Sequence, residues 1–169
     1  MADEAGLHPQ LLRAVIDINR DQRKLVGEKL RRLLGSLAGK RITLYGLTFK
    51  PNTDDLRDAP ALDIVRFLLG EGATVVGFDP AGMEHAKRLI PELAVAPDPY
   101  QAAVDADALV LVTEWNVFKQ LDWARLRRVM HQAILIDGRN MYDPLRIRDA
   151  GFVYEGIGIG CSSPLPVPR

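Results

Sequence analysis

The side chains best suited to chemistry lie in one polar segment, residues 46–60, which follows an apolar run and precedes a helical pattern. It holds an aromatic ring, Phe49, and two cations, Lys50 and Arg57, with a cluster of carboxylates between them. In open α/β sheets, ligands gather where such strands end. The two cations suit an anionic phosphate, and Phe49 offers an apolar face to a base or a sugar. The segment therefore predicts a mononucleotide-like or sugar-phosphate site.

The elements that must position this segment are short apolar runs, which alternate with helical patterns after residue 40. One apolar helical face is expected at 61–68 and a second at 121–130. Strands that alternate with helices favour right-handed crossovers and a mostly parallel sheet covered on both faces. The fold class expected is therefore α/β. The predicted strands are Arg41–Leu47, Thr74–Phe78, Leu93–Ala96, Ala108–Val112, Ala133–Ile136 and an edge strand at Phe152–Tyr154.

A long helix is expected before the sheet, because apolar residues recur at helical spacing from Pro9 to about Leu37. At 1.5 Å per residue it would run roughly 40 Å, so it should bridge two domains or pack on a partner chain. Two shorter helices broken near Gly27 are the alternative. The predicted organisation is a helix at 1–38, an α/β domain at 39–160 and an irregular proline-rich tail at 161–169.

The parallel topology predicts where the functional residues meet. Residues that follow parallel strands share one edge of the sheet, so segments far apart in sequence should converge there. Lys50 and Arg139 would then bind the same anionic ligand, Arg139 through its planar fork and Lys50 as a point charge. The segments expected at this edge are 48–57, 79–80, 113–115 and 137–140.

Simpler structural roles are open for the loop residues. Asp58 could cap the following helix, with Pro60 in its first turn. Arg57 could merely pair with Asp54 or Asp55, an interaction typically worth under about 1 kcal/mol at a surface.

Simpler roles are equally open elsewhere in the chain. A turn at residues 137–138 would leave Arg139 solvated. Trp115 is more typical of a packing residue than of a stacking platform. Cys161, in a tail rich in glycine and proline, is a poor candidate for a nucleophile.

Composition excludes several classes of partner. The 22 basic and 22 acidic side chains give a net charge of zero, and they are interspersed along the chain, so no nucleic-acid partner is expected. No apolar stretch has the length of a membrane helix, and the first residues are acidic, which favours a cytoplasmic protein. One cysteine and three histidines that lie far apart in the sequence argue against a metal site, so none is expected.

Two phosphate-binding motifs are missing from the sequence. No G-x-G-x-x-G follows a strand, and no G-x-x-x-x-G-K-[ST] occurs. The chain therefore lacks the usual loop for holding a whole dinucleotide by itself.

Ordered motifs along the chain resemble those of the UDP-glucose 6-dehydrogenase family. Residues 46–60 match its G-L-x-F-K-P-x-T-D-D-x-R-x-x-P signature, and Thr113-Glu114-Trp115, Asp137-Gly138-Arg139-Asn140 and Gly156-Ile157-Gly158 resemble further family stretches in the same order. Val15, Asn19 and Gln22 resemble the central helix of the family. The similarity covers about Pro9 to Gly160.

This resemblance implies an architecture and a reaction. The family oxidises the C6 alcohol of UDP-glucose to a carboxylate in two NAD-dependent steps, through intermediates bound to a cysteine. It has two Rossmann-like nucleotide-binding domains joined by a long helix that also forms a homodimer interface. The present chain resembles only that helix and the second, UDP-sugar-binding domain.

Residue roles follow from the same resemblance. Phe49, Lys50 and Arg139 match positions at the UDP-sugar, and Arg57 matches an arginine that approaches NAD across the cleft. Cys161 does not match the nucleophilic cysteine of the family, so no catalytic residue is expected in this chain.

The function expected is therefore that of the UDP-sugar-binding half of an NAD-dependent dehydrogenase, and the chain alone is expected to be inactive. NAD would be held mainly by a domain outside this chain. A homodimer would form through the long helix. A related dehydrogenase acting on GDP-mannose or a UDP-N-acetylhexosamine is one alternative. A dimerisation module without ligand affinity of its own is another.

Overall fold

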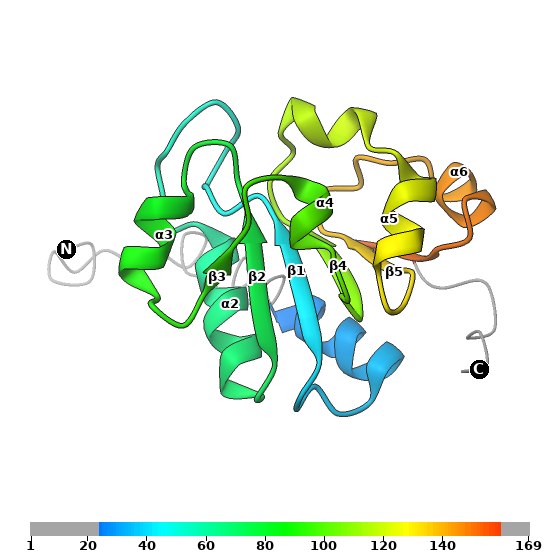
Figure 1. Ribbon diagram of the computed structural model, residues 1–169, viewed down its shortest axis with the longest axis horizontal. Helices are drawn as coiled ribbons and strands as arrows, with labels where there is room; N and C mark the ends of the chain where they lie inside the picture. Colours follow the sequence, from blue (N-terminus) through cyan, green and yellow to red (C-terminus); the bar gives the residue numbers. More distant parts are fainter. Residues whose placement is uncertain (1–23, 160–169) are drawn as a thin grey trace, which may run out of the picture.

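A six-stranded parallel sheet forms the centre of the computed structural model, which describes residues 24–159 (Figure 1). The strand order is β3-β2-β1-β4-β5-β6, in which the order reverses between β1 and β4. Ligands of open α/β sheets bind outside the carboxyl ends of the strands at such a reversal. The strands are β1 (Arg41–Tyr45), β2 (Thr74–Phe78), β3 (Ala94–Val95), β4 (Ala108–Leu111), β5 (Ile134–Asp137) and β6 (Val153–Gly156).

Helices connect successive strands, as parallel pairing requires. A further helical segment, residues 24–34, precedes β1 and is called the N-terminal helical segment below. The connecting helices are α2 (Pro60–Gly70), α3 (Met83–Leu89), α4 (Pro99–Ala102), the 3₁₀ helix η1 (Asn116–Gln120), α5 (Trp123–Val129) and α6 (Pro144–Asp149).

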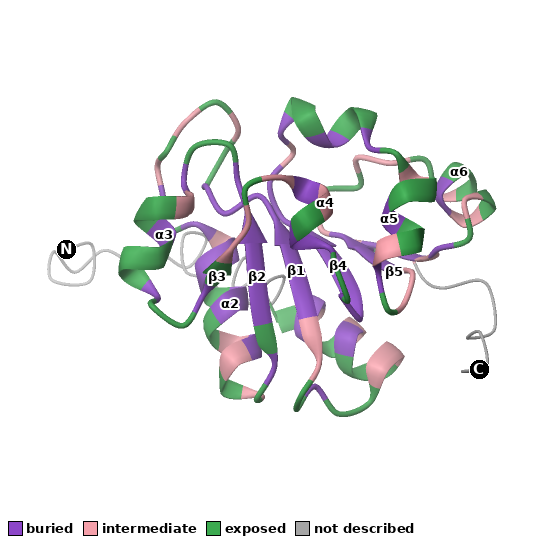
Figure 2. Ribbon diagram, viewed as in Figure 1, coloured by how far each residue is buried: buried purple, intermediate pink, exposed green. Residues whose placement is uncertain are grey.

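The sheet is covered on both faces, because alternate strand residues point to opposite sides. Along β1, Ile42 and Leu44 pack with α2, α3 and the N-terminal helical segment, whereas Tyr45 packs with α4, η1, α5 and α6. The strands are buried almost throughout, and the helices keep their outer faces exposed (Figure 2). Two apolar cores therefore fix the sheet, and its carboxyl edge is held in a rigid frame.

A buried ion pair attaches the N-terminal helical segment to the edge strand β6. Glu155 is fully buried, and one of its carboxylate oxygens accepts hydrogen bonds from Lys29 Nζ (3.0 Å) and from Arg32. Val26 and Leu30 of the same segment belong to the apolar core on this face of the sheet. Removing one partner of a buried ion pair leaves an uncompensated charge, so this contact specifies where the segment lies on the sheet.

The predicted α/β class and the parallel sheet are confirmed, with small shifts in the strand ends. The N-terminal helical segment runs without a break through Gly27, which packs closely against the ring of Phe67, so a break at Gly27 is wrong. The segment ends at residue 34, before Gly35 at a φ of +72°, and not near Leu37 as predicted. The predicted helix from Pro9 to residue 23, and Cys161 in the tail, lie outside the described residues.

The start of α2 also differs from one expectation. Pro60 occupies the first turn as predicted, but the capping position is Ala59, and no side chain caps this helix. Asp58 is instead a loop residue with a φ of +56°, a conformation that aspartate tolerates better than most side chains. Among the described residues, none of the helices is long and apolar enough to cross a membrane.

Candidate functional site

One buried carboxylate, Asp79 at the end of β2, joins three of the loops that leave the carboxyl edge of the sheet. Its side chain is fully buried and accepts six hydrogen bonds. Several hydrogen bonds to one carboxyl group hold the surrounding backbone more tightly than a single hydrogen bond does. The donors are Leu47 N (2.7 Å), Thr48 N (3.1 Å), Thr48 Oγ1 (3.0 Å), Ala81 N (2.9 Å), Gly82 N (2.8 Å) and Trp115 Nε1 (3.1 Å).

The close approach of the loops that follow β1 and β4 depends on Gly46. It has a φ of +84°, and a Cβ there would lie 2.5 Å from the Thr113 side chain and 2.6 Å from its backbone nitrogen. Only glycine adopts this geometry without strain. Thr113 Oγ1 donates to the carbonyl of Thr48 (2.5 Å), which joins the two loops directly. The convergence of segments at this edge, predicted from the sequence, is thus present.

The loop between β1 and α2 is closed on itself. Phe49 N donates to the carbonyl of Asp55 (2.9 Å), and Arg57 forms a two-bond pair with the Asp55 carboxylate (2.9 and 2.8 Å). These hydrogen bonds from Arg57, together with the charge of Lys50, hold the pKa of Asp55 well below its usual range. The Arg57 side chain is 88% exposed. The simple pairing of Arg57 with Asp55 is therefore what this structure contains.

Arg139 forms the second fork-shaped ion pair at this edge. Its Nε and Nη2 donate to the two carboxylate oxygens of Glu114 (2.5 and 2.8 Å). The hydrogen bonds from Arg139 lower the pKa of Glu114, and the charge of Lys119 lowers it further, so Glu114 is ionised at neutral pH. Since a guanidinium has five N–H donors, this pair leaves the Nη1 end of Arg139 for another acceptor.

The position of Arg139 is fixed from below by Asp137, the last residue of β5. One carboxylate oxygen of Asp137 accepts from Arg139 N (3.0 Å), and the other accepts from Tyr142 N (3.0 Å) and from the Tyr154 hydroxyl (3.0 Å). Asp137 is fully buried. The turn lies one residue later than predicted, at 138–139, because Asp137 still belongs to β5. The Arg139 side chain pairs with Glu114 and is 46% exposed, so it is both paired and partly solvated.

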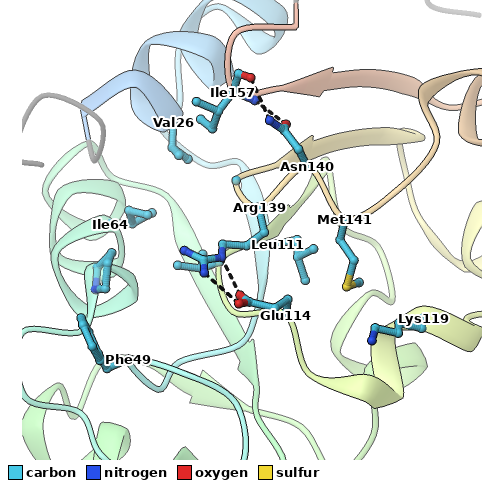
Figure 3. Close-up of a pocket in the computed structure, with 13 residues that line it drawn as sticks. Val26, Phe49, Ile64, Leu111, Glu114, Lys119, Arg139, Asn140, Met141 and Ile157 are labelled. Carbon is cyan, nitrogen blue, oxygen red and sulfur yellow. Dashed lines mark hydrogen bonds and ion pairs between the residues drawn. The ribbon is translucent and has the colours of Figure 1, made fainter.

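A pocket of about 660 Å³ opens at this edge, a size typical of small-molecule sites (Figure 3). Its walls are mostly apolar, and its charged groups are Arg139, Glu114 and Lys119. Two cations against one carboxylate leave a net positive charge, which favours an anionic ligand. The lining residues are Val26, Phe49, Pro60, Ile64, Leu111, Val112, Glu114, Lys119, Gly138, Arg139, Asn140, Met141 and Ile157.

The predicted site residues divide into two groups. Phe49, 51% exposed, and Arg139 both line the pocket. Lys50 and Arg57 are exposed and are not among the lining residues. Trp115 is buried and bonded to Asp79, so it is a packing residue as expected.

Sequence reasoning missed Lys119 as a site residue and gave Glu114 no chemical role. Glu114 follows β4, and the rule that residues after parallel strands share one edge could have identified it as a partner of Arg139. Lys119 lies in η1, a short helix after that strand, and its spacing carries no signal that separates it from a solvated lysine.

The strand order and the pocket at the carboxyl edge define an α/β domain of the doubly wound nucleotide-binding class. Residues 43–144 match the model of the UDP-glucose/GDP-mannose dehydrogenase family, UDP binding domain. The chain therefore belongs to this family, with a match that covers most of the sheet.

Relatives and solved structures agree with this assignment. A UDP-glucose 6-dehydrogenase of Rhizobium meliloti is 45% identical over 150 residues, which are 88% of this chain and 34% of the relative. The enzyme of the same name from Pseudomonas aeruginosa is 43% identical over 164 residues, 93% of this chain and 36% of the relative. A UDP-glucose dehydrogenase structure from Pyrobaculum islandicum has a TM-score of 0.79 at 29% identity, covering 94% of this chain and 34% of that one. This chain thus spans about a third of the length of these relatives.

Proposed function

We propose that the pocket binds the diphosphate and an adjoining ring of a UDP-sugar, and that Arg139 is its principal phosphate contact. The observation that carries the proposal is the Arg139 fork, oriented by Glu114 and accompanied by Lys119 in an otherwise apolar pocket. A planar guanidinium matches two phosphate oxygens at once. The apolar walls and Phe49 then accommodate the base or the sugar.

Lys50 and Arg57 have supporting roles in this proposal. Lys50 directly follows Phe49 in the chain and is exposed, and its long flexible side chain would bind a ligand phosphate as a mobile point charge. Arg57 approaches NAD across the cleft of the whole protein, and this requires its exposed pair with Asp55 to open. Exposed ion pairs contribute little net stability, so this pair can open when the ligand arrives.

The described residues do not fit NAD at the position where a doubly wound domain usually holds a dinucleotide. That position needs a glycine-rich turn after the first strand and a free carboxylate near the end of the second. Here a long polar loop follows β1, and Asp79 is buried with both oxygens occupied. We therefore assign to this domain only the binding and orientation of the UDP-sugar.

In the whole protein, the proposed activity is the NAD-dependent oxidation of UDP-glucose to UDP-glucuronate. The names of the relatives and the family match support this proposal. The hydride acceptor and the nucleophile belong to regions that this chain does not supply. The expected NADH production by the 169-residue chain alone is nil.

Isothermal titration calorimetry of the 169-residue chain with UDP tests the binding proposal. Arg139→Ala is expected to weaken binding about 10- to 100-fold, since hydrogen bonds to charged groups carry about 1.5–3 kcal/mol. Arg146→Ala removes an exposed arginine of α6 and serves as the matched control with unchanged affinity. Heat of binding from GDP and none from UDP would favour the GDP-mannose branch. No binding of either nucleotide by the folded chain contradicts the proposal.

Homodimer formation through the N-terminal helix stays a prediction. In the described part of that helix, Val26 and Leu30 pack on the sheet of their own domain, so a partner chain would use other side chains. Sedimentation equilibrium measures the state directly, and a monomer at all concentrations would contradict a dimer.

A further inference from the structure

Asn140 makes a two-bond contact between two loops that both line the pocket. Its Nδ2 donates to the carbonyl of Ile157 (3.0 Å), and its Oδ1 accepts from the amide of Ile157 (2.9 Å). The side-chain amide thus pairs with a backbone segment as a neighbouring strand would (Figure 3). We call this pair of hydrogen bonds the Asn140 brace.

Both ends of the brace are fixed to the sheet. On one side, Asp137 holds the backbone of Arg139. On the other side, Gly156 ends β6 and pairs with Ile159 across a tight turn (Gly156 N to Ile159 O, 3.2 Å). The brace therefore closes a ring of hydrogen bonds from β5 to β6.

The local backbone is shaped to allow this contact. Asn140 has a φ of +50°, in the left-handed region where asparagine is several-fold more common than other side chains. A Cβ at Gly156 would overlap Asn140 Oδ1. The brace lies at the surface, but it constrains the residue type at both Asn140 and Gly156.

We propose that Asn140 is a positioning residue for the ligand, an inference that rests on the function proposed above. By joining the Arg139 loop to the Ile157 turn, the brace holds the charged wall of the pocket and an apolar wall at a fixed separation. Arg139 then presents its Nη1 end to phosphate without an ordering cost on binding.

Three variants separate this role from a purely structural one. Asn140→Gly deletes both hydrogen bonds without strain at the left-handed φ. Gly156→Ala displaces Asn140 Oδ1 and leaves Asn140 itself in place, so it distinguishes positioning from direct contact of Asn140 with the ligand. Asp105→Gly is the control, because Asp105 has a similar φ (+56°) and lies at the opposite edge of the sheet.

Asn140→Gly and Gly156→Ala are each expected to weaken UDP binding about tenfold. The double variant should bind UDP no more weakly than either single variant, because both changes remove the same contact. Asp105→Gly should bind UDP with the affinity of the wild type. Hydrogen exchange of the Ile157 amide should accelerate at least about tenfold in Asn140→Gly, with amides in β4 and β5 unchanged.

The alternative outcomes are distinguishable. If the wild-type chain binds UDP and Asn140→Gly binds it equally well, the positioning role is overturned and the proposed function stands. If the losses of Asn140→Gly and Gly156→Ala add in the double variant, the two residues act independently and the positioning role is again overturned. Unchanged exchange at Ile157 overturns the brace itself. Failure of the wild-type chain to bind UDP overturns the proposed function, and the positioning role with it.

Discussion

Asp79→Asn tests the most heavily bonded group at the carboxyl edge of the sheet. The replacement keeps the shape of the side chain but turns one acceptor oxygen into an NH₂ donor. In the more favourable orientation of the new amide, its oxygen takes the place of Oδ2 and keeps the hydrogen bonds that Oδ2 accepts. The NH₂ group then takes the place of Oδ1 and faces the backbone amides of Ala81 and Gly82. The amides of Ala81 and Gly82 are then left without an acceptor beside a side chain that is fully buried.

The size of the effect follows from these two losses. A buried donor that loses its acceptor costs about 1–3 kcal/mol, so the two donors together give an expected loss of about 4 kcal/mol. This is a large part of the roughly 5–15 kcal/mol that stabilises a typical domain. The effect should spread to the pocket, because Asp79 also anchors Thr48 and Trp115 beside the loop of Phe49.

Urea unfolding followed by tryptophan fluorescence measures this loss. With a slope of about 2 kcal/mol/M, the midpoint should fall by about 2 M. Asp122→Asn is the matched control, because Asp122 caps α5 through one exposed hydrogen bond and asparagine caps equally well. A loss below about 1 kcal/mol for Asp79→Asn would refute the reasoning that this carboxylate holds the edge together.

Two further predictions concern pH and backbone geometry. Burial alone would raise the pKa of Asp107, but hydrogen bonds from Arg41 N, His131 and Gln132 and the charge of Lys40 outweigh it and lower the pKa. The stabilisation is therefore present above the ordinary aspartate range and lost as pH falls through the folded pKa. Asp107→Asn should cost about 2 kcal/mol at pH 7 in urea unfolding, and the cost should shrink steadily as the pH is lowered below the ordinary aspartate range; a constant difference would contradict this. Gly46→Ala should lower the free energy of unfolding by more than about 3 kcal/mol, because of strain at a positive φ and overlap with Thr113 in the loop after β4. Thermal unfolding measures this loss, and a melting temperature equal to that of the wild type would contradict the close approach of the two loops.

The sheet was predictable from the sequence because its strands are continuous apolar runs. Val75 and Leu109 lie in strands covered on both faces, and such strands carry a strong signal at the level of single residues. The short helices α4 and α6 carry little periodicity, since each has six residues or fewer and one or two buried positions. Their exact bounds come from Asp98 and Asp143, whose side chains cap them.

The candidate site was predictable only in part. Parallel topology identifies the edge and so brings Arg139 beside the loop of Phe49. It does not say which way an exposed side chain turns, and Lys50 lies outside the pocket although its neighbour lines it. Several carboxylates lie near this edge, and the sequence does not say which of them pairs with Arg139. The pairing with Glu114 depends on distances in the folded chain, which cannot be read from the spacing of residues in the sequence.

The central claim is that UDP binds at the pocket beside Arg139. Titration of the isotope-labelled 169-residue chain with UDP, followed by the amide chemical shifts of the protein, locates the ligand directly. The account predicts the largest shifts at Glu114, Lys119, Arg139 and Ile157, with small changes at the opposite edge around Asp107. Shifts concentrated away from the pocket, or none at saturating UDP, would contradict it.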